Sequence, residues 1–256
     1  MTPAPEVVVH PDAELLAAAL AARVLTALVD AQAARGTASL VVTGGGTGTA
    51  VLAKLRSSPA RDAVDWGRVD VYWGDERFLP HGDPERNETQ ARAALLDHVP
   101  VDPARVFAMA PSDGPLGDDP EAAAAEYART LAARSPVGEG SPSAVPRFDV
   151  LLLGIGEEGH VASVFPDSPA VHERVRTVVA VRDCPKPPPT RISMTLPTVR
   201  AADQVWLCVA GAGKADAVQR ALGGAAEVDL PAAGAQGLSR TLWVLDAAAA
   251  SLLPGR

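Results

Sequence analysis

The sequence predicts a doubly wound α/β fold, in which a mostly parallel sheet is covered by helices on both faces. Short runs rich in Val and Leu, each of strand length, alternate along the chain with helical stretches. Gly-containing loops follow several of these runs. This alternation is typical of parallel strands joined by crossover helices. The chain has 256 residues, of which 47% are hydrophobic, and we expect one domain spanning residues 1–256.

The first predicted element is a helix over about residues 12–34, in an Ala-rich stretch that Gly36 ends. Apolar residues recur there every four positions, as on one buried helix face, at Leu16, Leu20, Val24 and Leu28. Strands are predicted over residues 39–43, 69–72, 106–109, 149–153, 177–181, 191–196, 204–209 and 241–245. Helices are predicted between them over residues 49–56, 88–97, 121–133 and 214–222. Residues 111–120 and 135–146, rich in Pro, Gly and Ser, are expected to be surface loops.

Composition excludes several classes of protein. A net charge of −8 with no basic run argues against nucleic acid or an anionic membrane as a partner. Cys184 and Cys208 are too few for a disulfide framework or a four-Cys zinc site, which fits a reducing cytoplasm. No basic-then-apolar leader and no stretch of 18 apolar residues is present. We therefore expect a cytoplasmic protein. The absence of a Cys cluster and of a His-Glu-x-x-His motif predicts that it needs no metal, and we expect no cofactor. The sequence leaves the oligomeric state open between a monomer and a small homo-oligomer.

Four loops that follow predicted strands carry unusual residues: 43–48, 74–77, 154–160 and 211–214. In a parallel sheet such loops converge at the carboxyl edge, where ligands bind. In the first loop, Gly44, Gly45 and Gly46 could bring backbone N–H groups to a phosphate or carboxylate, or could serve only a tight turn. The loop lacks the Gly-Lys-Ser/Thr of a Walker A motif.

The third loop matches G-x-G-x-x-G, but its context disfavours a dinucleotide site. Glu157 and Glu158 would oppose a pyrophosphate, and Pro166 leaves little room for a crossover helix. His160 follows at the expected start of a short helix and is the candidate general base, since a neutral imidazole accepts protons near neutral pH. The alternative is a histidine that only caps or packs that helix.

Several charged residues are candidate ligand contacts. Asp75 and Arg77 end a predicted strand and could equally form a structural ion pair. Arg191 follows a stiff Pro-rich run that could aim its guanidinium at an anion. Lys214 opens a helix, a place that disfavours a cation unless an anionic ligand binds there.

Five motifs occur together in order: GGGTG, YWGDERFLP, LLLGIGEEGHVASVFP, PPPTRISMTLP and GAGK. With these motifs the chain resembles the 6-phosphogluconolactonase family over nearly its whole length, and GEEGHVASVFP (residues 156–166) is the most specific element, supported by DERF (75–78). The resemblance implies the fold shared with glucosamine-6-phosphate deaminases and ribose-5-phosphate isomerases. It also implies hydrolysis of 6-phospho-D-glucono-1,5-lactone, the second step of the oxidative pentose phosphate pathway.

The resemblance also implies site residues. His160 would be the general base, and Glu158 would orient it or assist proton transfer. The phosphate would be held, or the lactone carbonyl polarised, by a set of basic residues: Arg77, Arg191 and Lys214. Further substrate contacts are expected from the amides of the glycine loop and from two polar side chains: Gly44, Gly45, Gly46, Asp75 and Asn87.

The chain departs from the family pattern at three places. Glu158 stands where Asp is more usual, Gly46-Thr47-Gly48 where Ser-Thr-Pro is usual, and Arg86 where Ser precedes the Asn. Arg86 could therefore add a phosphate contact. Two alternative functions are a glucosamine-6-phosphate deaminase and a non-catalytic sugar-phosphate sensor. The deaminase typically shows HIAFNEP and DEY, where this chain has HVASVFP and DER.

Overall fold

The computed structural model describes residues 4–136 and 144–254, which form two sheets and their covering helices. The larger sheet has seven strands in the order β1-β10-β9-β6-β2-β3-β5, and every neighbouring pair is parallel. Its strands are β1 (Glu6–His10), β2 (Ala38–Val42), β3 (Val69–Trp73), β5 (Val106–Phe107), β6 (Val150–Leu153), β9 (Gln204–Val209) and β10 (Arg240–Asp246). The mostly parallel sheet predicted from the sequence is confirmed.

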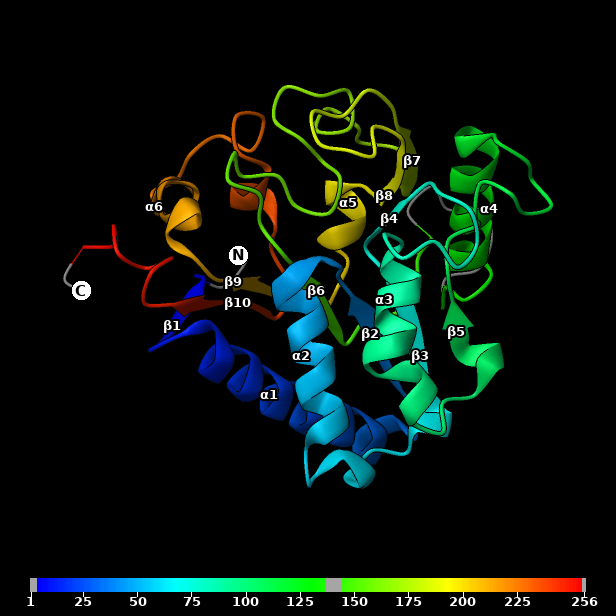
Figure 1. The fold of residues 1–256 in the computed structure, drawn as a ribbon, viewed down its shortest axis with the longest axis horizontal. Helices are drawn as coiled ribbons and strands as arrows, with labels where there is room; N and C mark the ends of the chain where they lie inside the picture. The colour runs from blue at the N-terminus through cyan, green and yellow to red at the C-terminus, as the bar shows by residue number, and fades with distance from the viewer. Residues whose placement is uncertain (1–3, 137–143, 255–256) are drawn as a thin grey trace.

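Helices surround this sheet (Figure 1). They are α1 (Ala13–Arg35), α2 (Gly45–Ser57), α3 (Asn87–Ala94), α4 (Pro120–Ala132), α5 (Leu196–Val199) and α6 (Ala215–Leu222). Short 3-10 helices lie at Arg61–Ala63, Trp66–Arg68, Leu96–His98, Pro103–Arg105, Ala212–Lys214 and Pro231–Gly234. Every residue of β2 and β6 is buried, so both faces of the central strands are covered. No helix in these two ranges is both long and apolar enough to cross a bilayer.

The residues at the two ends of helix α1 explain where the helix begins and ends. The Asp12 carboxylate accepts a hydrogen bond of 2.8 Å from the Leu15 N–H, and Gly36 ends the helix in the left-handed conformation, with φ of 78°. The predicted face of Leu16, Leu20, Val24 and Leu28 is fully buried. The prediction for this element is confirmed to within a residue at each end.

The smaller sheet was not predicted. It contains β4 (Asp75–Arg77), β8 (Arg191–Met194) and β7 (Val178–Val181) in that order, and both pairs are antiparallel. The sequence placed 177–181 and 191–196 among the alternating elements of a parallel sheet and placed 74–77 in a loop. A parallel pair needs a crossover of a dozen or more residues, usually a helix. Only a Pro-rich loop joins β7 to β8, so the chain returns directly and the pair is antiparallel.

Other boundaries differ locally from the predictions. The helix expected over 88–97 ends at Ala94, and the strand expected over 106–109 has two residues. The short strand β1 and the short helix α5 were not predicted. Of the expected loop 135–146, residues 137–143 lie outside the described part of the chain.

The strand order places a topological switch beside β2. From β2 the chain proceeds to β3 and β5 on one side, then returns to β6 on the other side of β2. The loops that leave β2 and β6 therefore diverge, and a crevice opens between them at the carboxyl edge. The Gly154 N–H, after β6, lies 3.4 Å from the Thr43 hydroxyl, after β2. Buried apolar side chains from both sheets form one continuous core beneath this edge.

Candidate active site

A cavity of about 280 Å³ lies at this crevice. Its walls come from the loops after β2 and β6, from β4, from the start of α3 and from the segment 186–191. It is lined by most of the residues that the sequence predicted: Gly44, Gly45, Asp75, Arg77, Asn87, His160, Arg191 and Lys214. A smaller hollow of about 180 Å³ shares Gly44, Gly45 and Lys214 with it and adds Gly46. The expectation that the four post-strand loops meet at one edge is confirmed.

A larger hollow, of about 530 Å³, lies at the opposite edge of the sheet, beside α1 and the starts of β9 and β10. Arg35 is paired there with Asp149, and Arg240 is paired with Glu6. Among the described residues that line it, none belongs to a loop that follows a strand or to the first turn of a helix. We therefore place the functional site at the smaller cavity of the carboxyl edge.

His160 lines the cavity and is hydrogen-bonded to Glu158, which stands behind it and is not itself a lining residue. The His160 Nδ1 lies 2.9 Å from Glu158 Oε1. Because an ionised carboxylate only accepts hydrogen bonds, Nδ1 carries the proton and Nε2 keeps its lone pair. Gly156 makes room for this pair, since a Cβ there would lie 1.9 Å from His160 Nδ1. The ring of His160 also packs on Phe165, with centroids 4.5 Å apart.

The short helix expected to begin at His160 does not form. Gly159 is left-handed, with φ of 90°, and residues 157–163 fold as turns around a single bridge between Val161 and Val164. His160 therefore caps no helix. Its ring packs on Phe165, so a packing role stays the alternative to its role as a base.

Electrostatics keep the pair in the form that can accept a proton. Burial lowers the pKa of His160 below its ordinary value, and the carboxylate of Glu158 opposes this only in part. Burial disfavours the charged form of Glu158, but hydrogen bonds from Lys186, its own backbone and His160 outweigh it and lower the pKa to about 2. At neutral pH the pair is therefore a neutral imidazole beside an ionised carboxylate.

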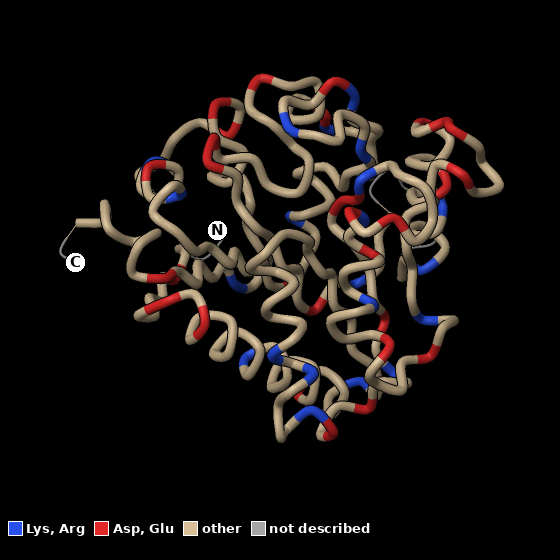
Figure 2. The backbone as a smooth tube through the Cα atoms, viewed as in Figure 1, with Lys and Arg blue, Asp and Glu red and all other residues tan. Residues whose placement is uncertain are grey.

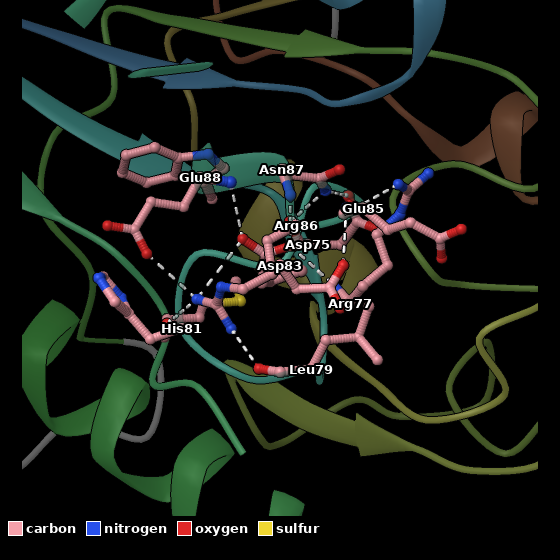
Figure 3. Close-up of polar contacts among 12 residues, drawn as sticks. Asp75, Arg77, Leu79, His81, Asp83, Glu85, Arg86, Asn87 and Glu88 are labelled. Atoms are coloured by element: carbon pink, nitrogen blue, oxygen red, sulfur yellow. Dashed lines mark hydrogen bonds and ion pairs between the residues drawn. The ribbon is translucent and has the colours of Figure 1, made fainter. Parts of the chain in front are cut away.

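The strand β4 sends alternate side chains to opposite sides. Asp75 and Arg77 line the cavity, whereas Glu76 points away from it and is fully buried. Asp75 accepts a 2.7 Å hydrogen bond from the Ser163 hydroxyl. The Nη1 of Arg77 donates a hydrogen bond to the Glu85 carbonyl at 2.5 Å (Figure 3). The Nε of Arg77 is buried and has no hydrogen-bond partner.

Asn87 lies at the base of the cavity, at the first residue of α3. Its Nδ2 donates to the Asp75 carbonyl at 2.8 Å, which fixes the side chain, while its buried Oδ1 has no partner. Gly44 packs directly against it, since a Cβ on Gly44 would lie 1.9 Å from Oδ1. Buried polar atoms without partners are uncommon in proteins, and Arg77 Nε and Asn87 Oδ1 both belong to residues that line the cavity.

Arg86 does not contribute to the cavity, contrary to the suggestion of a phosphate contact. It is fully buried and donates to the carbonyls of Leu79 and Met109 and to the Glu88 carboxylate, as Figure 3 shows. A second carboxylate, that of Glu76, lies 3.7 Å away. Its charge is thus neutralised inside the protein, and its role is structural.

Arg191 lines the cavity, but two of its three guanidinium nitrogens already donate hydrogen bonds within the protein. Nε donates to the Pro188 carbonyl, and Nη2 donates to the carbonyls of Lys186 and Pro187, all at 3.1–3.2 Å. Nη1 lies 4.0 Å from Asp75. Arg191 therefore holds the Pro-rich loop in place, and only Nη1 is left to reach a ligand.

Lys214 and the glycine loop form the other end of the cavity. Gly44 is the N-cap of α2 and Gly45 its first residue, so the unpaired N–H groups of that helix start face the hollow. Lys214 immediately precedes α6, and no acid lies within 4 Å of it among the described residues. Burial lowers its pKa, and Lys186 adds to this effect. Such an arrangement suits an anion.

The family model described as glucosamine-6-phosphate isomerases/6-phosphogluconolactonase matches residues 11–243 of the chain. The chain belongs to this family. A 6-phosphogluconolactonase of Streptomyces coelicolor is 63% identical over 254 residues, which are 99% of this chain and 97% of the relative. One from Mycobacterium tuberculosis is 51% identical over 246 residues, covering 96% and 97%. The structure of 6-phosphogluconolactonase from Trypanosoma brucei superposes with a TM-score of 0.83 at 27% identity, covering 99% of this chain and all of that one.

As a member of this isomerase/lactonase family, the chain carries two residues near the candidate base that the sequence did not single out. Lys186 lines the cavity, and its Nζ lies 2.8 Å from Glu158 Oε2. Ser163 is fully buried and fixes Asp75. Ser163 lies inside the motif LLLGIGEEGHVASVFP, and Lys186 directly precedes the motif PPPTRISMTLP. These positions were the only sign in the sequence that the two residues belong to the site.

Proposed function

We propose that the chain hydrolyses 6-phospho-D-glucono-1,5-lactone to 6-phospho-D-gluconate, as its relatives' names indicate for them. One observation carries this proposal at the level of the site. A neutral histidine, oriented by a carboxylate, lines a cavity together with Arg77, Asn87 and a lysine that has no acid within 4 Å among the described residues. A lactone has an activated carbonyl, so its hydrolysis needs mainly a base for water and donors for the oxyanion.

The proposed reaction begins at His160. Its Nε2 accepts a proton from water as the water oxygen attacks C1 of the lactone. The carbonyl oxygen then carries the negative charge, and the guanidinium of Arg77, which lines the cavity, is the proposed stabilising group. As the tetrahedral intermediate collapses, the bond between C1 and the ring oxygen breaks, and the imidazolium returns its proton to that oxygen. The new carboxylic acid loses its proton to solvent.

The proposed substrate orientation places the phosphate away from His160. Lys214 and the amides of Gly44, Gly45 and Gly46 would bind it, because cations and helix starts both favour anions. Asn87 Oδ1 would accept a hydrogen bond from a sugar hydroxyl. Binding through the phosphate would then position the carbonyl without contributing to the bond changes themselves.

The decisive experiment compares two substrates. The purified chain should accelerate formation of 6-phosphogluconate from the lactone in a coupled dehydrogenase assay. It should release no ammonia from glucosamine 6-phosphate. Ammonia release without lactone hydrolysis would replace our proposal with deaminase activity, and neither activity would favour a sugar-phosphate sensor.

Residues 1–256 are proposed to act as one domain, which the continuous apolar core beneath both sheets supports. The cytoplasmic location and a monomeric or small homo-oligomeric state stay predictions from the sequence.

A further inference from the structure

We infer that Lys186 is a positioning residue that acts on His160 through Glu158, an inference that rests on the proposed lactone hydrolysis. The Glu158 carboxylate bridges the other two side chains. Its Oε1 accepts from His160 Nδ1 at 2.9 Å, and its Oε2 accepts from Lys186 Nζ at 2.8 Å. Each oxygen thus has its own charged or polar partner, so the carboxylate cannot rotate without losing a hydrogen bond.

The backbone of Lys186 is itself fixed by the site. Its carbonyl accepts hydrogen bonds from Arg191 Nη2 at 3.2 Å and from the Cys184 thiol at 3.0 Å. The guanidinium of Arg191 lies over the ring of Phe165, 5.9 Å from its centroid, and that ring packs against His160. The contacts therefore close a circuit from His160 through Glu158, Lys186, Arg191 and Phe165 back to His160.

The circuit gives Lys186 two effects on the base. Its ammonium stabilises the ionised form of Glu158, which keeps the proton of His160 on Nδ1 and the lone pair on Nε2. Its positive charge also disfavours the imidazolium, in the same direction as burial. Glu158 and Asp75 act in the opposite direction on His160. A contact to substrate is the competing role, because Lys186 also lines the cavity.

The two roles predict different kinetics for Lys186→Met. If Lys186 positions His160, kcat should fall about 10- to 100-fold, less than the loss expected on removing the tautomer-fixing carboxylate itself, while KM changes little. The acidic limb of the kcat profile should move to higher pH, because a repelling charge has been removed. Glu158→Gln should move the same limb to lower pH, because it removes a charge that favours the imidazolium. Lys186→Arg keeps the positive charge, so its acidic limb should have the wild-type midpoint and its kcat should be close to that of the wild type.

The control is Lys54→Met, because Lys54 pairs with Glu14 of α1 at the surface. This variant should leave both kcat and the acidic limb of the pH profile unchanged. A readout that needs no activity is the titration of His160 by ¹⁵N NMR of the full chain, with the signal assigned by its absence in His160→Gln. Lys186→Met should raise the midpoint of that titration and weaken the preference for the Nδ1–H tautomer. If Lys186→Met does not fold, Lys186→Gln replaces it.

A raised KM with unchanged kcat, limb and titration would overturn the inference and make Lys186 a substrate contact. An unchanged titration in both Lys186→Met and Lys186→Gln would overturn it as well. If the wild-type chain does not hydrolyse the lactone, the proposed function falls, whereas the NMR titration still decides whether Lys186 acts on His160.

Discussion

His160 combines three properties of a general base: a fixed tautomer, a pKa below the ordinary value of 6.5, and a place in the cavity wall. Replacing it with Gln preserves size and removes the proton acceptor. A positioned base contributes ~10²–10⁴-fold, so the turnover of His160→Gln should fall by about that factor while product affinity changes little. The uncatalysed hydrolysis of the lactone must be subtracted. Near wild-type turnover would shift the search for the base to Asp75 or Glu157.

The pH profile of the wild type gives a second check on His160. The pKa of the imidazole is lowered, so the ring is neutral and can accept a proton at any pH above that pKa. Activity is lost as the pH falls through the pKa and the ring becomes protonated. Glu158, with a pKa of about 2, remains ionised throughout this range. The acidic limb should therefore have a single midpoint below 6.5.

Lys214 lines both hollows at the carboxyl edge, and we propose that it binds the phosphate. Losing a charge-assisted hydrogen bond costs about 1.5–3 kcal/mol, so Lys214→Ala should weaken 6-phosphogluconate binding by about 10- to 150-fold in calorimetric titrations. Arg191→Ala should act differently, because it also releases the loop that it holds through three carbonyls. Unchanged affinity in Lys214→Ala would move the phosphate to another part of the cavity.

The residues that sequence could identify are those whose partners lie close along the chain. His160 and Glu158 share one loop, so their pairing was predictable. Lys186 stands 28 positions from Glu158, and only the folded loop brings them together. Arg86 was misjudged for a related reason, since arginines are mostly exposed and its burial depends on carbonyls and carboxylates from three other segments.

At the scale of elements, β4 and α3 are joined by Glu76. Arg86, the N-cap of α3, makes no side-chain cap, and the Glu76 carboxylate takes its place by accepting from the N–H groups of Asn87 and Glu88 at 2.6 and 2.8 Å. A third hydrogen bond comes from the Arg77 N–H. The helix that carries Asn87 is thus held to the strand that carries Asp75 and Arg77.

Glu76→Ala should therefore lower the free energy of unfolding by at least about 3 kcal/mol, because three backbone donors lose their acceptor and Arg86 loses a neighbouring carboxylate. Equilibrium urea denaturation measures this difference. Glu85→Ala, an exposed carboxylate in the same segment, should stay within about 0.5 kcal/mol of wild type. A loss below about 1 kcal/mol for Glu76→Ala would show that the cap is dispensable.

Periodicity predicted the long elements and missed the short ones. Helix α1 has enough turns for its apolar face to be visible, and the buried central strands read as continuous apolar runs. Strand β4 has three charged residues, so neither alternation nor an apolar run marks it. Strand β1 is a brief Val run before α1, and its pairing partner is at the other end of the chain.

At the scale of the whole molecule, an acidic chain gathers basic residues around the cavity proposed to bind an anion. Acidic and basic residues are interspersed along the backbone, as Figure 2 shows, and the net charge is −8. Four basic residues reach the cavity because three segments of the chain converge at one sheet edge, and they are Arg77, Lys186, Arg191 and Lys214. The predicted order of strands, loops and helices was enough to predict this convergence. It did not predict the antiparallel second sheet, whose strands β4 and β8 form one wall of the cavity.

The pairing of β1 with β10 has a consequence for how the protein is made. The two strands are tied by the ion pair of Glu6 and Arg240, whose positions are 234 residues apart. On the ribosome β1 emerges before β10 and must wait for it before that side of the sheet can close. Until β10 is available, the edge of β9 that it covers stays unpaired, which is the interval in which a chaperone would be most useful to the nascent chain.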